Sequence, residues 1–158
     1  MTTQYFNYNK QKTIQALRYH FISRKEIKMM IILINVFSIL SAGLYFYNKI
    51  SPTAFLLSSA LWLLMMFMFW FLLPTIVYKK SPSFKQRLKV SINDDSFILE
   101  NENGQKRWEW TAFNNWIESP HFFHLYFTST SFFLIPKDCF EGDAVHEARN
   151  YFKEKIKK

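Results

Sequence analysis

Two long uncharged segments constrain most strongly what this chain can fold into. Residues 29–48 and 51–78 contain no Asp, Glu, Lys, Arg or His, and only Lys49 and Ile50 separate them. About 20 helical residues cross the hydrocarbon core of a bilayer, so each segment is long enough to span it. A soluble protein of 158 residues has too little other chain to cover two helices that are apolar on every side. We therefore predict a transmembrane hairpin over residues 29–78, with spans at 29–48 and 51–78.

The residues around the short connection are typical of a helical hairpin. Ser51 is placed to cap the second helix, and Pro52 then takes the first helical position, where its missing N–H has no cost. Pro74 lies near the other end of the second span. Because proline cannot donate the helical hydrogen bond, we expect Pro74 to kink or loosen the helix there.

Small residues occur at matching heights of the two predicted spans. When the hairpin is folded about residue 50, two clusters become level with each other: Ser41, Ala42 and Gly43, and Ser58, Ser59 and Ala60. Small side chains let helices approach closely inside a membrane, so we predict that these clusters form the contact between the spans. Asn35 is the one strongly polar residue of the first span, which favours a helix contact or a homo-oligomer over transport.

Basic residues flank the predicted hairpin on the side of the chain ends. Residues 1–93 contain 12 Lys and Arg but only one acidic residue, Glu26, and the turn between the spans carries Lys49 alone. The positive-inside rule then places both termini in the cytoplasm and the protein in the cytoplasmic (inner) membrane. The basic residues after the second span are expected to contact anionic lipid: Lys79, Lys80, Lys85, Arg87 and Lys89.

Residues 1–28 are predicted to form a short strand followed by an amphipathic helix. The alternation within Gln4–Tyr8 indicates the strand, and Asn9 is placed to cap a helix over about Lys10–Ser23. Ile14, Leu17 and Phe21 would share one face of that helix. A basic amphipathic helix beside a span is expected to lie in the membrane interface or to pack on the cytoplasmic part.

Residues 79–158 are predicted to form a cytoplasmic module that is rich in antiparallel strands. Alternating apolar and polar residues and turn signals predict strands at 88–92, 96–100, 106–110, 116–118, 122–128 and 131–135. Asn103-Gly104 is a strong hairpin signal, because both residue types tolerate positive φ. Trp108 and Trp110 are expected to share one face of the third strand.

The last segment completes the expected fold class, which is α+β. An apolar stripe that includes Ala148 and Phe152 predicts a helix over 144–157, capped by Asp138 or Asp143. Because both faces of the strand 122–128 are partly apolar, we expect a small antiparallel barrel or sandwich with this helix packed outside it. The layout is that of a small pleckstrin-homology-like module closed by a C-terminal helix.

Several segments resemble the YcxB-like family of small bacterial membrane proteins. They are Glu109–Phe113, Phe122–Phe127 and Ile135–Phe140. The order of elements along the chain also resembles that family: an N-terminal helix, a two-span hairpin, a basic stretch and a soluble module. The resemblance implies a pleckstrin-homology-like cytoplasmic domain without an established enzymatic activity. The residues that carry it are read as structural: Trp110, Phe113, Pro136, Lys137 and Phe140. Asp138 stands where a basic residue is commoner in the family, which weakens the idea that this loop contacts phosphate.

The sequence contains no pattern that indicates catalysis or a bound cofactor. His121 and His124 would point to opposite strand faces and cannot easily share a metal ion, and Cys139 has only Lys137 as a close basic neighbour. With three Gly in the chain, phosphate-binding loops are hard to build. Nucleic acid is not an expected partner, since residues 81–158 carry equal numbers of acidic and basic side chains. We predict no catalytic residue, no metal site and no cofactor.

These features favour an interaction or regulatory role over an enzyme. The bilayer is one expected partner, and the module is expected to bind a protein partner or lipid headgroups. One alternative is a membrane-embedded immunity or resistance protein that protects its producer from a toxin. A second alternative, less favoured, is an enzyme that acts at the membrane surface.

Overall fold

The computed structural model describes residues 1–156 and divides into two compact units. The helical unit comprises residues 17–80, and the β-rich unit comprises residues 1–16 with the chain from Ser81 onward. Helix α1 (Lys10–Ser23) starts in the β-rich unit and ends in the helical unit. Its bounds are those predicted, and the side chain of Asn9 accepts a hydrogen bond from the N–H of Lys12 (3.2 Å), so the predicted cap is confirmed.

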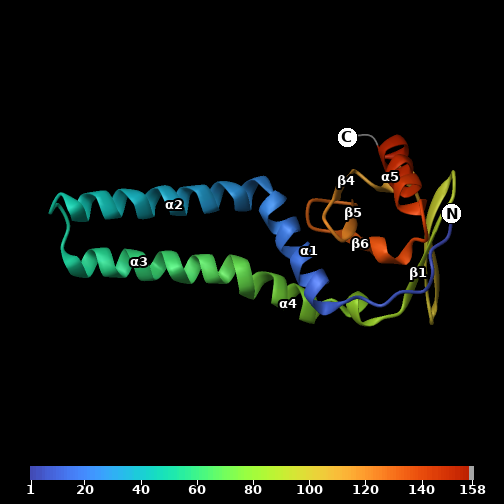
Figure 1. Cartoon of the computed structure of the whole chain (residues 1–158), viewed down its shortest axis with the longest axis horizontal. Coiled ribbons are helices and arrows are strands. Elements are labelled where there is room, and N and C mark those ends of the chain that lie inside the picture. Colours follow the sequence, from blue (N-terminus) through green and yellow to red (C-terminus); the bar gives the residue numbers. More distant parts are fainter. Residues whose placement is uncertain (157–158) are drawn as a thin grey trace. The chain divides into compact units, whose positions relative to one another are not determined.

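The helical unit is a hairpin of two long helices. Helix α2 (Lys25–Phe46) runs antiparallel to α3 (Pro52–Phe67), which continues through a π-helical segment (Met68–Leu72) into α4 (Leu73–Lys80) (Figure 1). At the start of α3, the Ser51 hydroxyl accepts a hydrogen bond from the N–H of Ala54 at 3.2 Å, as the sequence predicted. Asn48 provides the turn with a positive φ of 53°.

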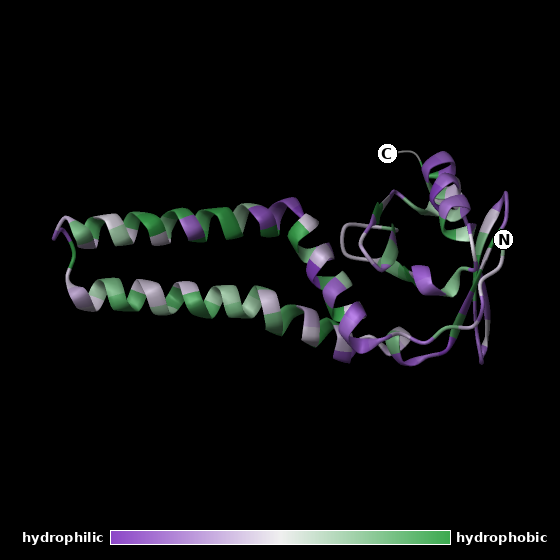
Figure 2. Ribbon diagram, viewed as in Figure 1, coloured by the Kyte–Doolittle hydropathy of each residue, from purple (hydrophilic) through white to green (hydrophobic). Residues whose placement is uncertain are grey.

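Hydrophobic residues, coloured green in Figure 2, occur along the length of both long helices. The helices Lys25–Phe46 and Pro52–Lys80 are long and apolar enough to cross a membrane, and only a small share of either is buried. Among the described residues, all but three of the well-exposed large apolar side chains lie between Met29 and Ile76. Leu33 and Ile39, for example, are 68% and 71% exposed.

One wide helical turn lies immediately before Pro74. Pro74 has no N–H to offer the carbonyl of Trp70, and its ring crowds that oxygen, which accounts for the π-helical segment. The side chain of Arg18 supplies the missing donor, because its Nε lies 2.9 Å from the Trp70 carbonyl oxygen. The guanidinium also lies 5.3 Å from the ring centroids of Trp70 and Phe71. The predicted loosening near Pro74 is confirmed.

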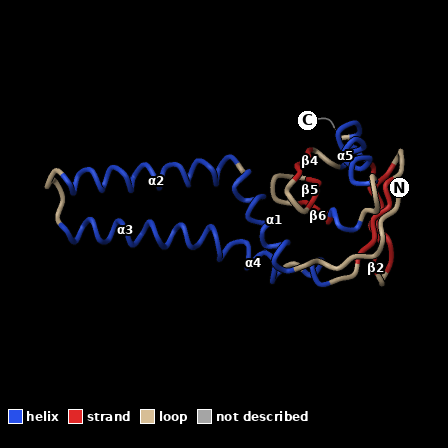
Figure 3. Tube along the Cα trace, viewed as in Figure 1, coloured by secondary structure: helices blue, strands red, loops and turns tan. Residues whose placement is uncertain are grey.

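The β-rich unit contains two three-stranded antiparallel sheets (Figure 3). The first has the order β1-β2-β3 and the second β4-β5-β6. Their bounds are β1 Leu88–Ile92, β2 Ser96–Asn101, β3 Gly104–Glu109, β4 Asn115–Glu118, β5 Phe122–Tyr126 and β6 Phe132–Pro136. All six predicted strands are present, with ends that differ from the predictions by a few residues.

Within residues 1–156 the sheets do not close into a barrel, which corrects one form of the expected fold. A 3₁₀ turn at Trp110–Ala112 follows β3 and ends its pairing before β4 begins. The N-terminal residues contact both β1 and the turn after β6. The Thr3 N–H donates to the Val90 carbonyl (2.8 Å), and the Gln4 N–H donates to the Cys139 carbonyl (3.2 Å). The strand expected at Gln4–Tyr8 is limited to bridges at Thr2 and Phe6.

The hairpin predicted at Asn101–Gly104 is confirmed, but the expected positive φ at both turn positions and the expected place of Trp110 in the third strand were wrong. Asn101 pairs with Gly104, so the two-residue turn is Glu102-Asn103, and only Gly104 has a positive φ (148°). The Asn101 side chain organises this turn by accepting the Asn103 N–H at 2.9 Å. Trp110 lies outside β3, where its indole N–H donates to the Asn93 carbonyl at 3.0 Å.

Helix α5 (Ala144–Lys155) contributes Ala148 and Phe152 to the hydrophobic core, so the apolar stripe predicted for the C-terminal helix is confirmed. Ala148 and Phe152 are fully buried, and the Phe152 ring centroid lies 5.2 Å from that of Phe123 on β5. Asp143 precedes the helix but its side chain makes no capping hydrogen bond. The predicted helix end at Lys157 lies outside the described residues.

Candidate functional site

A polar pocket of about 310 Å³ lies in the β-rich unit beside the β2–β3 turn. Its lining combines two cations, one carboxylate and four side-chain amides: Lys85, Arg87, Glu102, Asn7, Gln86, Asn101 and Asn103. Nearly all of these side chains are exposed, so a ligand can reach them. The pocket contains two of the five residues predicted to contact anionic lipid, Lys85 and Arg87. The amides and the carboxylate around them were not predicted from the sequence.

Short-range contacts hold the walls of this pocket in place. The Asn101 Nδ2 donates to Gln86 Oε1 at 3.2 Å, which joins the end of β2 to the segment before β1. The Arg87 guanidinium lies 5.3 Å from the ring centroid of Tyr5. The hydroxyl of Tyr5 in turn donates to the Glu100 carboxylate, and this hydrogen bond raises the pKa of Tyr5. Arg87 is therefore supported by an aromatic ring that is itself fixed.

The other three predicted lipid-contact residues have different surroundings. Lys89 is half-buried, with its Nζ 5.3 Å from the Tyr5 ring centroid and 4.0 Å from the Glu100 carboxylate. The Lys89 ammonium therefore already interacts with Tyr5 and Glu100 within the β-rich unit. Lys79 and Lys80 are exposed and form the last turn of α4, in the helical unit. There they also suit the negative end of the helix dipole.

The structure brings together part of the predicted contact between the spans. Ser41 Oγ and Ser58 Oγ lie 2.6 Å apart, and Ser59 bonds to the Phe55 carbonyl of its own helix. A Cβ added at Gly43 would meet no atom within 4 Å, so this glycine is not needed for close approach. Ala42 and Ala60 are exposed.

A second polar contact also joins these two helices. The Trp62 Nε1 donates to Asn35 Oδ1 at 3.3 Å, and the Asn35 Nδ2 donates to the Ile31 carbonyl at 2.8 Å. Both ends of the Asn35 amide are thus occupied within the hairpin.

The residues that carried the family resemblance have structural positions. Trp110, Phe113 and Phe140 belong to the hydrophobic core, and the Pro136 carbonyl accepts the thiol of Cys139 at 2.8 Å. Lys137 instead joins an ion-pair network, with its Nζ 2.6 Å from Glu118.

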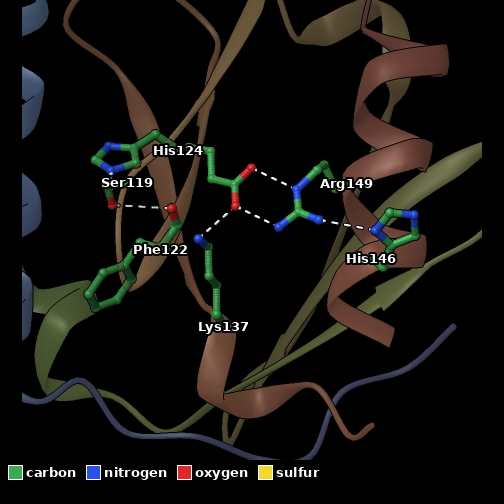
Figure 4. Close-up of polar contacts among 7 residues, drawn as sticks. Ser119, Phe122, His124, Lys137, His146 and Arg149 are labelled. Atoms are coloured by element: carbon green, nitrogen blue, oxygen red, sulfur yellow. Dashed lines mark hydrogen bonds and ion pairs between the residues drawn. The ribbon is translucent and has the colours of Figure 1, made fainter. Parts of the chain in front are cut away.

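Glu118 is the centre of that network. Figure 4 labels its two cationic partners, Lys137 and Arg149. Arg149 on α5 binds it in a bidentate manner, with both nitrogen–oxygen distances at 2.8 Å, and also contacts His146 Nδ1 at 3.2 Å. The hydrogen bonds from Arg149, followed by those from Lys137, lower the pKa of Glu118 to about 2. The network therefore ties β4 to the turn after β6 and to the C-terminal helix.

Two further groups have residue types that commonly perform chemistry. His124 Nε2 lies 2.9 Å from Ser119 Oγ, which itself bonds to the Phe122 carbonyl (Figure 4). Both His124 and Ser119 are buried, at 0% and 4% exposed. Cys139 is buried as well, and burial raises the pKa of its thiol to about 12. A thiol with this pKa is a poor nucleophile.

No cluster of three or more metal-ligand side chains occurs among residues 1–156. His121 precedes β5 and is half-buried, whereas His124 lies within β5 and is fully buried. His20, on α1, is also buried, which lowers its pKa to about 4.

A comparison with protein-family models found a match to part of the chain. Residues 92–152, less than half of the chain, match the family model of the YcxB-like protein, which confirms the resemblance over these residues. The match begins at the end of β1 and reaches into α5, so it covers most of the β-rich unit. Searches of curated proteins and of solved structures found no match to the chain.

Proposed function

Since residues 92–152 carry a YcxB-like assignment, we propose that this chain is an integral protein of the bacterial inner membrane. Its two long helices cross the bilayer, and its β-rich unit is a pleckstrin-homology-like binding module on the cytoplasmic side. Its role is interaction or regulation, and it has no enzymatic activity of its own.

The observation that carries this proposal is the exposure of the two long helices. Leu57 and Leu63 are 67% and 61% exposed, like most of their apolar neighbours. Burying a leucine side chain is worth about 1.5–3 kcal/mol, so a hairpin with this surface is strongly unfavourable in water. A core helix of a soluble protein would be mostly buried, whereas only 6% and 11% of the apolar windows are buried here. A lipid environment removes this cost.

The proposed orientation follows from the charges at the ends of the hairpin. Lys79 and Lys80 end the second span, and Arg24, Lys25 and Lys28 begin the first. The connecting turn has Lys49 alone. This asymmetry supports a turn outside the cytoplasm and a β-rich unit inside it.

The interior of the β-rich unit supports binding over catalysis. His124, Ser119 and Cys139, three side chains of types that commonly perform chemistry, are buried. The pocket at Lys85 and Arg87 gathers accessible polar and charged side chains that are suited to recognise a charged ligand. This is the surface at which the proposed binding activity would reside.

Cysteine labelling in intact cells tests the membrane location and orientation together. In a Cys139→Ser background, Lys49→Cys should react with a membrane-impermeant maleimide added outside. The matched variant Glu154→Cys, on exposed α5, should react only after the cells are opened. Washing with carbonate should leave both variants in the membrane pellet. Extraction by carbonate, or labelling of Glu154→Cys from outside, would contradict the proposal.

A further inference from the structure

The polar pocket beside the β2–β3 turn has a charge pattern that suits a zwitterion. Lys85 and Arg87 carry positive charge, and Glu102 places one negative charge on the same lining. Within residues 1–156, none of these three residues has an ion-pair partner within 4.0 Å. A purely anionic ligand would be repelled by Glu102, whereas a ligand with a phosphate and an amine can use all three charges.

We propose that this pocket binds the phosphoethanolamine headgroup of a membrane phospholipid. Lys85 and Arg87 hold the phosphate, and Glu102 accepts hydrogen bonds from the primary ammonium. The proposal rests on the proposed membrane location of the chain. It goes beyond that function by naming the ligand, its orientation and the residue that distinguishes it from other headgroups.

The fixed amides around the charges support this orientation. Gln86 Oε1 is engaged by Asn101, which leaves the Nε2 N–H groups of Gln86 as donors for phosphate oxygens. Asn101 Oδ1 is likewise engaged by the Asn103 N–H, so the turn that carries Glu102 is held in one conformation. Arg87 is stacked on Tyr5. These contacts reduce the side-chain freedom that Gln86, Asn101 and Arg87 lose when a headgroup binds.

The covalent chain keeps the pocket within reach of the membrane surface. Lys85 follows the last residue of α4, Lys80, by five positions, and five residues extend over at most about 18 Å. Part of this segment is the compact 3₁₀ turn Pro82–Lys85. A lipid headgroup, present in the bilayer at high local concentration, is therefore the source of ligand that this position favours over a soluble compound.

The primary amine is the feature that should decide specificity. An ethanolamine ammonium has three N–H donors and makes charge-assisted hydrogen bonds to a carboxylate. The trimethylated ammonium of phosphocholine has none, although its charge is the same. A phosphoglycerol headgroup lacks the positive charge and would leave Glu102 without a counter-charge. We expect a preference for ethanolamine over choline of roughly tenfold, the size of one such hydrogen bond.

Native mass spectrometry of the full-length protein in detergent measures this preference directly. Phosphatidylethanolamine, phosphatidylcholine and phosphatidylglycerol with identical acyl chains are added in equal amounts. The wild type should retain mainly phosphatidylethanolamine. Glu102→Gln should bring the ethanolamine and choline lipids to similar levels, and Lys85→Gln with Arg87→Gln should reduce retention of all three. The matched controls Lys153→Gln and Glu154→Gln, on exposed α5, should behave as the wild type.

Three results of this measurement, and one of a competition experiment, would overturn the assignment. They are equal retention of ethanolamine and choline lipids by the wild type, a dominant phosphatidylglycerol adduct, and an unchanged ratio in Glu102→Gln. Displacement of the lipid by micromolar glycerophosphoethanolamine would identify a soluble ligand and would also overturn it. A protein that resists carbonate but shows no preference for ethanolamine refutes only this inference, and the proposed membrane location would stand.

Discussion

The hydrogen bond from Arg18 to the Trp70 carbonyl allows a sharp test of how the second long helix tolerates Pro74. In the wild type, Arg18 Nε supplies the donor that proline lacks, at 2.9 Å. The change Arg18→Met removes this donor and puts an unbranched apolar side chain in its place. The change Pro74→Ala restores a backbone N–H that can bond to Trp70. The two changes should therefore be coupled in a double-mutant cycle.

The expected magnitude follows from the contacts. A hydrogen bond from a charged group contributes about 1.5–3 kcal/mol, and stacking of the guanidinium on the rings of Trp70 and Phe71 adds about 0.5–1 kcal/mol. Arg18→Met should thus lower the free energy of unfolding by about 2–4 kcal/mol. In the Pro74→Ala background only the stacking is lost, so the same change should cost about 1 kcal/mol or less.

Equilibrium unfolding in mixed detergent micelles, followed by circular dichroism, measures the four free energies of the cycle. Lys28→Met removes a positive charge from an exposed position of α2 and serves as the control, with little effect in either background. If Arg18→Met costs the same in the wild-type and the Pro74→Ala backgrounds, the Arg18 side chain does not replace the missing donor and the reasoning is refuted.

Three other measurements test separate parts of the structure. Glu118→Gln should lower the free energy of unfolding by about 1–2 kcal/mol at pH 7; because the pKa of Glu118 is lowered to about 2, the difference should shrink as the pH falls from 4.5 toward 2. Cys139 should react slowly with iodoacetamide at pH 8 in the folded protein and rapidly after denaturation, since its pKa is about 12. Ser41→Cys with Ser58→Cys should form a disulfide on mild oxidation, whereas Ala42→Cys with Ser58→Cys should not.

Periodicity along the chain was sufficient to predict most elements of the fold. The alternation in Leu88–Ile92 identified β1 with its correct ends, and the cap at Asn9 located the start of α1. The uncharged runs located the long helices, although α2 begins at Lys25, before the apolar run. Its first turn extends into polar residues because helical hydrogen bonds do not require apolar side chains.

The predictions failed where a choice depended on contacts between distant segments. A strand with two apolar faces, such as β5, indicates burial on both sides but does not say which segment covers which face. The structure places α5 on the Phe123 face, because Phe152 completes the aromatic core there. The barrel did not form because the turn at Trp110–Ala112 directs the chain away from β3.

The candidate site was predicted only in part for the same reason. Lys85 and Arg87 stood out as basic residues after a predicted span, but nothing local connected them to Glu102 or to the amides. The signal that could have suggested the pocket was the polar turn Asn101–Gly104 opposite the basic segment in the β1–β2 pairing. The network of Glu118 had no local signal, since Arg149 follows it by 31 positions.

Local patterns thus established the two apolar helices, the strand alternation and the absence of familiar catalytic motifs, because each depends on residues that are neighbours along the chain. The tertiary structure alone decided which charges meet. It brought Arg18 to a carbonyl 52 positions away, gave Glu118 its two cations, and buried Cys139 and His124. Such pairings depend on how separate elements pack, and the period of a helix or strand carries no information about its partner.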